Sequence, residues 1–84
     1  MNRQAKKSLS VYYRVGCHLC DAMIAELRGL QHELAFELEL VDIDKDPDLR
    51  KRYNVDVPVV TLGTEVVCFH FFEEDMVRQA LQDG

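Results

Sequence analysis

Gly16-Cys17-His18-Leu19-Cys20 is the stretch that decides the fold of this chain. The residues before it, Leu9 to Val15, are rich in β-branched and aromatic side chains, which is typical of a buried strand. After it, apolar residues recur every three or four positions, which indicates one face of a helix. They are Cys20, Met23, Ile24, Leu27 and Leu30. Two cysteines therefore lie where a strand gives way to a helix.

The start of a helix is a chemically distinctive place for a thiol. The first N–H groups of a helix have no internal partner and carry a partial positive charge. The thiolate is the reactive form of cysteine, and this position favours the anion, most of all at Cys17. Cys20, one turn further along, is placed to attack a mixed disulfide on Cys17 and to release the partner as a thiol.

The composition is that of one small globular domain covering residues 1–84. Hydrophobic residues make up 48% of the chain and charged residues 30%, which suits a domain with one core. The net charge is −5, and the ten Lys and Arg are scattered apart from Arg50-Lys51-Arg52, so we expect no nucleic-acid partner. No apolar run approaches the length of a membrane span, so we expect no membrane partner either.

The compartment is predicted from the N-terminus and the cysteines. No unbroken apolar segment follows Lys6 and Lys7, so no signal-peptide pattern is present and we expect a cytoplasmic protein. The chain has three cysteines, and an odd count is not typical of a disulfide-stapled secreted scaffold. Redox or metal chemistry in a reducing compartment fits this count better.

The first half of the chain is predicted to be tail, strand, helix and strand. Residues 1–7 are polar and expected to be flexible. A strand over 8–15 leads into a helix that runs from the cysteines to residue 31 or 32. Residues 36–43 alternate and predict a second strand, parallel to the first because a helix joins the two. Its exposed Glu37 and Glu39 place it at a sheet edge.

The second half is predicted to be helix, strand, strand and helix. Asp46 suits an N-cap, Pro47 suits the first helical position, and Asn54 suits a left-handed C-terminal residue. Residues 57–62 and 65–69 form a predicted hairpin. The last helix, 73–82, is expected to bury its apolar side chains, which are Met76, Val77, Ala80 and Leu81.

Two features of this arrangement carry a family resemblance. They are Cys17-His18-Leu19-Cys20 at the strand-to-helix junction and Val57-Pro58 ahead of the hairpin. With them the chain resembles thioredoxin-fold proteins of the glutaredoxin-like kind, and above all small ones with a Cys-His-Leu-Cys active site. The resemblance implies an α/β fold of order β-α-β-α-β-β-α, with a four-stranded mixed sheet in the order 2-1-3-4 and helices on both faces.

The resemblance also implies roles for individual residues. Cys17 would be the exposed nucleophile and Cys20 the more buried resolving thiol. Pro58 would be cis and packed against the disulfide, leaving the backbone of Val57 free to pair with the extended chain of a substrate. Arg14 stands where glutaredoxins place a cation that holds a glutathione carboxylate, and its alternative is an ordinary charge at a strand end.

Two interpretations of His18 are open. As a cation between the two thiols it would stabilise the thiolate of Cys17, and it is counted here among the substrate-side residues. The alternative is a solvated side chain with little effect.

Three segments depart from the glutaredoxin pattern. His18-Leu19 replaces the usual Pro-Tyr, and Asp56 replaces the Thr that normally precedes Val-Pro. Residues 68–72, Cys-Phe-His-Phe-Phe, replace a Gly-Gly and polar stretch that grips glutathione. The dithiol mechanism therefore transfers, whereas the use of glutathione as a co-substrate is doubtful. Phe71-Phe72 would instead present an apolar surface to a protein or another ligand.

The sequence thus predicts a monomeric thiol–disulfide oxidoreductase that needs no metal or organic cofactor. Its substrate would be a disulfide-containing protein or a small thiol compound. One alternative is a non-catalytic binding module that has kept the fold and the thiols. Another is a zinc site formed by Cys17, Cys20, Cys68 and His70, although a lone Cys68 is more typical of a buried apolar residue.

Overall fold

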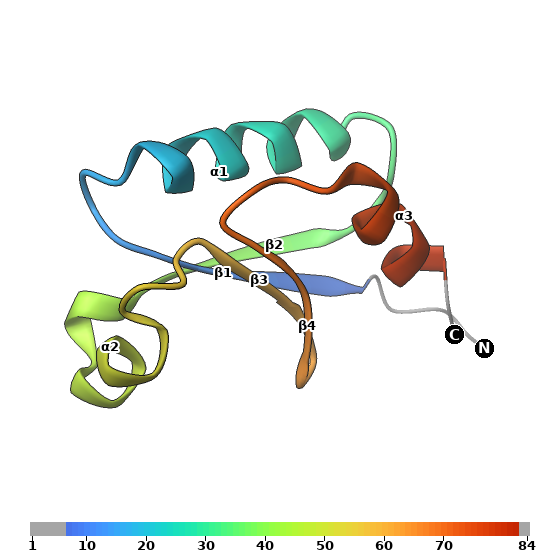
Figure 1. The fold of residues 1–84 in the computed structure, drawn as a ribbon. Coiled ribbons are helices and arrows are strands. Elements are labelled where there is room, and N and C mark those ends of the chain that lie inside the picture. The colour runs from blue at the N-terminus through green and yellow to red at the C-terminus, as the bar shows by residue number, and fades with distance from the viewer. Residues whose placement is uncertain (1–6, 83–84) are drawn as a thin grey trace.

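A four-stranded mixed sheet runs through the middle of the molecule in the computed structural model, which describes residues 7–82 (Figure 1). β1 (Ser8–Tyr13) pairs in parallel with β2 (Glu37–Asp42). On its other side β1 pairs antiparallel with β3 (Val59–Leu62), which pairs antiparallel with β4 (Glu65–Phe69). The strand order is β2-β1-β3-β4, so the predicted topology is confirmed and β2 is an edge strand.

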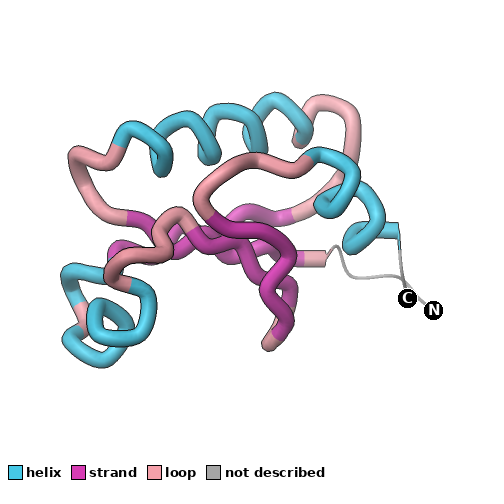
Figure 2. The backbone as a smooth tube through the Cα atoms, in the orientation of Figure 1, coloured by secondary structure: helices cyan, strands magenta, loops and turns pink. Residues whose placement is uncertain are grey.

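Helices cover both faces of this sheet (Figures 1 and 2). α1 (His18–Leu30) and α3 (Glu74–Gln82) lie on one face, and α2 (Pro47–Tyr53) lies on the other. Asp46 caps α2 as predicted, because its carboxylate accepts the backbone N–H groups of the first turn. A short 3₁₀ turn, η1 (Ile43–Lys45), joins β2 to α2 and was not predicted.

The molecule buries two apolar clusters of different size. The larger cluster lies between the sheet, α1 and α3, and its fully buried members are Leu9, Val11, Met23, Leu27, Val60 and Val77. The smaller cluster holds Cys20, Ile43 and Val57, with Tyr53 of α2 packed against it. The second cysteine and the residue before Pro58 are therefore packed in one apolar unit, near the sulfur end of α1.

Two predictions about the second half of the chain are wrong. Asn54 has right-handed backbone angles, φ −43° and ψ −51°, because the chain goes on in a right-handed turn that the Asp56 N–H closes on the Tyr53 carbonyl at 2.9 Å. Met76 is 48% exposed, since α3 turns Val77 toward the core and a helix this short buries only a narrow stripe.

The predicted flexible tail covers residues 1–7, of which 1–6 lie outside the described residues. Lys7 is held in place: its ammonium group donates to the Ala80 carbonyl at 3.2 Å, and its own carbonyl accepts from the Glu37 N–H at 2.8 Å. Across residues 7–82 no helix is both long enough and apolar enough to cross a membrane.

Candidate redox site

The sulfur pair lies at the first turn of α1, where the sequence analysis placed it. Gly16 has a φ of 82°, a conformation that favours glycine, and it turns the chain from β1 toward the helix. Cys17 has an extended backbone and is the N-cap residue. Its Sγ accepts a hydrogen bond from the backbone N–H of Cys20 at 3.1 Å. The same Sγ is joined to Cys20 in a disulfide.

The two sulfur residues differ in their exposure. Cys17 is partly exposed, whereas Cys20 is fully buried against Ile43 and Val57. A reactant arriving from solvent therefore meets Cys17 first. The backbone N–H of Cys20, which donates to Cys17 Sγ, is also placed to stabilise a Cys17 thiolate when the pair is reduced.

Val57-Pro58 lies beside the pair, between the small cluster and β3. The peptide bond between these residues is cis. Pro58 is fully buried, and its carbonyl accepts the His70 N–H at 2.8 Å, which ties it to the segment after β4. Neither the N–H nor the carbonyl of Val57 is used in any backbone hydrogen bond found within residues 7–82.

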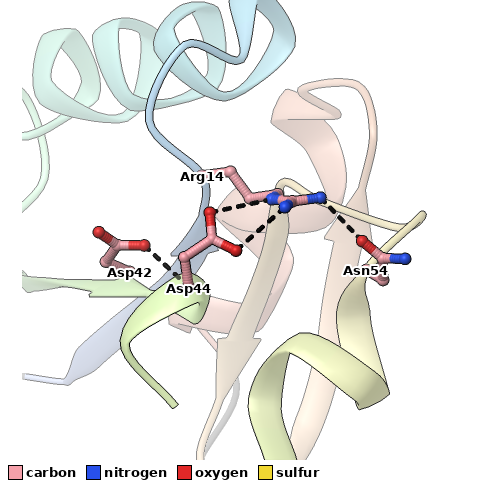
Figure 3. A network of polar contacts seen from close by, with 4 residues as sticks. All are labelled: Arg14, Asp42, Asp44 and Asn54. Atoms are coloured by element: carbon pink, nitrogen blue, oxygen red, sulfur yellow. Dashed lines mark hydrogen bonds and ion pairs between the residues drawn. The ribbon is translucent and has the colours of Figure 1, made fainter. Parts of the chain in front are cut away.

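Arg14 is part of a polar network with Asp42, Asp44 and Asn54 (Figure 3). Its Nε and one terminal nitrogen donate to the two carboxylate oxygens of Asp44, at 3.1 and 3.0 Å. Its other terminal nitrogen donates to the Asn54 side-chain oxygen at 2.8 Å. Asp42 in turn accepts the backbone N–H of Asp44. All three guanidinium nitrogens of Arg14 therefore already have partners inside the protein.

Asp44 and Asn54 were not predicted as partners of Arg14. They lie 30 and 40 residues away along the chain, so no local pattern joins them. One signal was available: β1 and β2 are parallel and Tyr13 pairs with Asp42, so the residues just beyond each strand end must lie near one another. The pairing register, once known, predicts the ion pair.

An apolar groove of about 260 Å³ lies between α1 and the segment after β4, and its lining includes Leu19 from between the two cysteines. Leu19, which stands between the two cysteines, is 41% exposed, and Phe71 on the opposite wall is 65% exposed. The lining residues are Leu19, Ala22, Met23, Glu26, His70, Phe71 and Phe72. The predicted apolar surface around Phe71-Phe72 is thus hollowed rather than flat.

A second hollow, of about 280 Å³, lies on the α2 side of the sheet. It is lined by Tyr53, Asp56, Val59, Val66 and Phe69. His70 separates the two hollows and has a positive φ of 69°, which is uncommon for a residue with a side chain. This bend sends Phe69 and Phe71 to different hollows, and no sequence signal pointed to it.

The remaining candidate residues stand apart from this arrangement. His18 is exposed and has no hydrogen-bond or ion-pair partner within residues 7–82. Cys68 is buried, as expected, and burial raises the pKa of its thiol. In the described part of the chain no three His, Cys, Asp or Glu side chains are grouped so that they could hold a metal ion.

Comparison with known families decides the relationship. The family model for the glutaredoxin-like domain (DUF836) matches residues 8–82. The chain belongs to this family. No curated protein matches the sequence at a significant level.

Solved structures agree with this assignment. Protein Ne2328 from Nitrosomonas europaea is 41% identical with a TM-score of 0.81, over 98% of this chain and 100% of that one. Protein XcR50 from X. campestris is 30% identical with a TM-score of 0.66, over 87% of this chain and 93% of that one. Thioredoxin from Fasciola hepatica is 17% identical with a TM-score of 0.59, over 90% and 78% of the two chains, and this likeness shows the thioredoxin fold.

In this glutaredoxin-like domain the first-turn cysteines are therefore chemically distinct. One sulfur is reachable and capped by a backbone donor, and the other is buried within bonding distance of it. This arrangement fits an oxidoreductase in general.

Proposed function

We propose that this protein is a thiol–disulfide oxidoreductase, with Cys17 as the nucleophile and Cys20 as the resolving thiol. One observation carries the proposal: the partly exposed Cys17 caps α1 and is joined to a buried Cys20. The unused N–H and carbonyl of Val57 lie beside the pair and offer an extended substrate chain two hydrogen bonds. The exposed His18 is proposed as a further substrate contact, whereas Arg14 is already bound by Asp44 and Asn54.

The reaction balances within two exchange steps. The thiolate of reduced Cys17 attacks one sulfur of a substrate disulfide, an S–S bond to Cys17 forms, and the other substrate sulfur leaves as a thiolate that takes up a proton. The Cys20 thiol loses its proton and attacks Cys17 Sγ, which releases the second substrate thiol. The substrate gains two electrons and the protein pair becomes the disulfide. A thiol or dithiol reductant must then restore the pair.

The substrate class proposed here is a disulfide-containing protein or a small disulfide, rather than glutathione. Arg14, the residue expected to hold a glutathione carboxylate, is already bound by Asp44 and Asn54. Asp56, next to Val57, adds a negative charge where an anionic tripeptide would lie. The chemistry needs no metal or organic cofactor. We further propose that the protein acts as a monomer in the cytoplasm, where thiol reductants are available.

The test uses serine variants made in a Cys68→Ser background, so that no third thiol confuses the result. Cys17→Ser should show no disulfide reduction above the uncatalysed rate. Cys20→Ser should accumulate a mixed disulfide with the substrate, seen as an added mass that a reductant removes. A parent protein that is inactive on protein disulfides, small disulfides and glutathione mixed disulfides alike would contradict the proposal and favour the non-catalytic binding module.

A further inference from the structure

One wall of the groove lined by Leu19 and Phe71 is a backbone segment held by two hydrogen bonds. The His70 N–H bonds to the Pro58 carbonyl at 2.8 Å, and the Phe71 N–H bonds to the Phe69 carbonyl at 2.8 Å. These two bonds fix the bend that turns Phe71 toward solvent, while Phe72 packs on the larger core. Phe71 is therefore presented by a tied segment, and its exposure is a feature of the fold.

The groove also reaches Leu19, the residue just before Cys20 in the chain. An occupant that contacts Leu19 therefore touches a residue between the two cysteines, one position from Cys20 in the chain. Exposed apolar side chains scattered singly over a surface are ordinary, whereas a contiguous and hollowed apolar patch marks an interaction site. Leu19 and Phe71 face each other across such a patch.

The far end of the groove is negatively charged. Glu26 lines it and has no ion-pair partner within residues 7–82. Glu26 and Phe72 also line an adjoining hollow that contains Glu33, Glu74 and Arg78. The guanidinium group of Arg78 is fully engaged, since Nε bonds Glu74 at 2.7 Å and the two terminal nitrogens bond Glu33 at 2.7 and 2.8 Å. The hollow thus holds three carboxylates and one cation, Arg78, which is paired with Glu33 and Glu74 and leaves Glu26 without a partner there.

We propose that this groove recognises protein substrates that carry an apolar side chain and a Lys or Arg beside the target cysteine. The apolar side chain would lie between Leu19 and Phe71, and the cation would reach Glu26. This inference rests on the proposed oxidoreductase function and names its substrate class. Glutathione, an acidic tripeptide, has no apolar side chain to place between Leu19 and Phe71. Its one cation lies beside carboxylates, which Glu26 would repel. The same groove therefore discriminates against glutathione.

The experiment compares two short synthetic peptides, each with one cysteine joined in a disulfide to the chromophore nitrothiobenzoate. One peptide has Phe and Lys beside the cysteine, and the other has Ser and Glu there. Release of the chromophore by the reduced protein gives a rate constant for each peptide. The same reaction with dithiothreitol, which has no groove, corrects for the intrinsic reactivity of the two disulfides. We expect a corrected preference of about tenfold for the Phe–Lys peptide, the size typical of losing one interface anchor.

Two exposed phenylalanines supply a matched pair of variants. Phe71→Ser should abolish the preference, whereas Phe69→Ser, which removes a similar side chain from the other hollow, should leave it within about twofold. Leu19→Ser tests the opposite wall and serves as the second variant should Phe71→Ser fail to fold. Equal corrected rates for the two peptides, or a preference that survives both Phe71→Ser and Leu19→Ser, would overturn the inference.

A failure of the proposed function gives a different result. Neither peptide would then react faster than it does with Cys17→Ser. Docking is measured separately with the same peptides carrying alanine in place of cysteine, through NMR shift changes at Leu19 and Phe71. Shifts at these residues with the Phe–Lys peptide alone would uphold the groove as a docking site even for an inactive protein, and their absence would overturn it.

Discussion

The two sides of the molecule at the cysteine end of α1 differ in whether their charged side chains have partners. On the α2 side of the sheet, Arg14 is bound by Asp44 and Asn54, so a cation that looks available in the sequence is fully engaged (Figure 3). On the α1 side, Phe71 is exposed and Glu26 has no ion-pair partner in the described part of the chain.

This difference shows which side is open to a ligand. Inserting a carboxylate at Arg14 would first require breaking a bidentate ion pair and a further hydrogen bond. Filling the groove beside Leu19 and Phe71 breaks no contact and removes apolar surface from water. The groups on the polar side are therefore already paired with one another, whereas the proposed recognition surface is the apolar side.

The largest expected effect is a difference in solvent access between the cysteines. In the reduced protein, iodoacetamide should modify Cys17 on the order of ten to a hundred times faster than Cys20 or Cys68, because both of these are buried and Cys17 is not. Burial also keeps Cys68 protonated by raising the pKa of its thiol. Peptide mapping after brief alkylation gives the three rates. Equal labelling of Cys17 and Cys20 would contradict the assignment of nucleophile and resolving thiol.

The second contrast reverses one charge on the open side. Glu26→Lys should raise the KM for the Phe–Lys peptide by about three- to tenfold, because a favourable charge contact becomes a repulsive one. Glu37→Lys is the matched control, since Glu37 is exposed on β2 and lies outside the groove, and its KM should stay within about twofold of the parent value. Equal effects of the two variants on KM would show that the net charge of the protein, and not Glu26 in the groove, attracts the peptide.

The third contrast removes the cation on the closed side. Arg14→Met should leave the KM for a glutathione mixed disulfide within about twofold, because the guanidinium group is engaged inside the protein. The same variant should lower the free energy of unfolding by about 0.5–1 kcal/mol, the usual worth of a half-exposed pair with good geometry. Steady-state kinetics and urea unfolding measure the two effects. A large rise in KM with unchanged stability would assign Arg14 to the substrate after all.

The smallest contrast concerns the ion pair at the far end of the groove. Hydrogen bonding and then charge attraction from Arg78 lower the pKa of Glu33 from its usual value. A carboxylate with a lowered folded-state pKa stabilises the fold above its unfolded pKa of about 4.3, and this contribution is lost as the pH falls through the folded pKa. Arg78→Gln should therefore be less stable than the parent at pH 7, and the difference should shrink on acidification. Urea unfolding at pH 7 and near pH 3 checks the trend, and a difference that grows in acid would contradict it.

The parts of the fold that the sequence predicted are those written in local patterns. The period of the apolar residues gave α1, Asp46-Pro47 gave the start of α2, and the charges of Glu37 and Glu39 gave the edge position of β2. The dithiol was found from the two cysteines at a strand-to-helix junction, whereas the roles of Val57 and Pro58 came from the family resemblance. Each of these signals acts within a few residues, so a single sequence contains it.

The parts that were missed depend on distant contacts or on a backbone angle. Arg14 meets Asp44 only because β1 and β2 pair in one register. His70 adopts a positive φ although it is not a glycine, and the hydrogen bond that its N–H donates to the Pro58 carbonyl holds it there. Met76 was expected in the core because the pattern of a short helix does not fix its rotation to within one residue. The groove depends on His70 and was therefore visible in the sequence only as an apolar stretch.

The central claim is that Cys17 and Cys20 cycle between a disulfide and a dithiol while the fold stays intact. The most direct test equilibrates the Cys68→Ser protein with dithiothreitol buffers of graded oxidation and measures the mass after alkylation. The account predicts a single two-electron transition in which both cysteines gain or lose the label together, with the far-ultraviolet circular dichroism unchanged. A pair that stays reduced or stays oxidised across the whole series, or that opens only when the protein unfolds, would contradict the account.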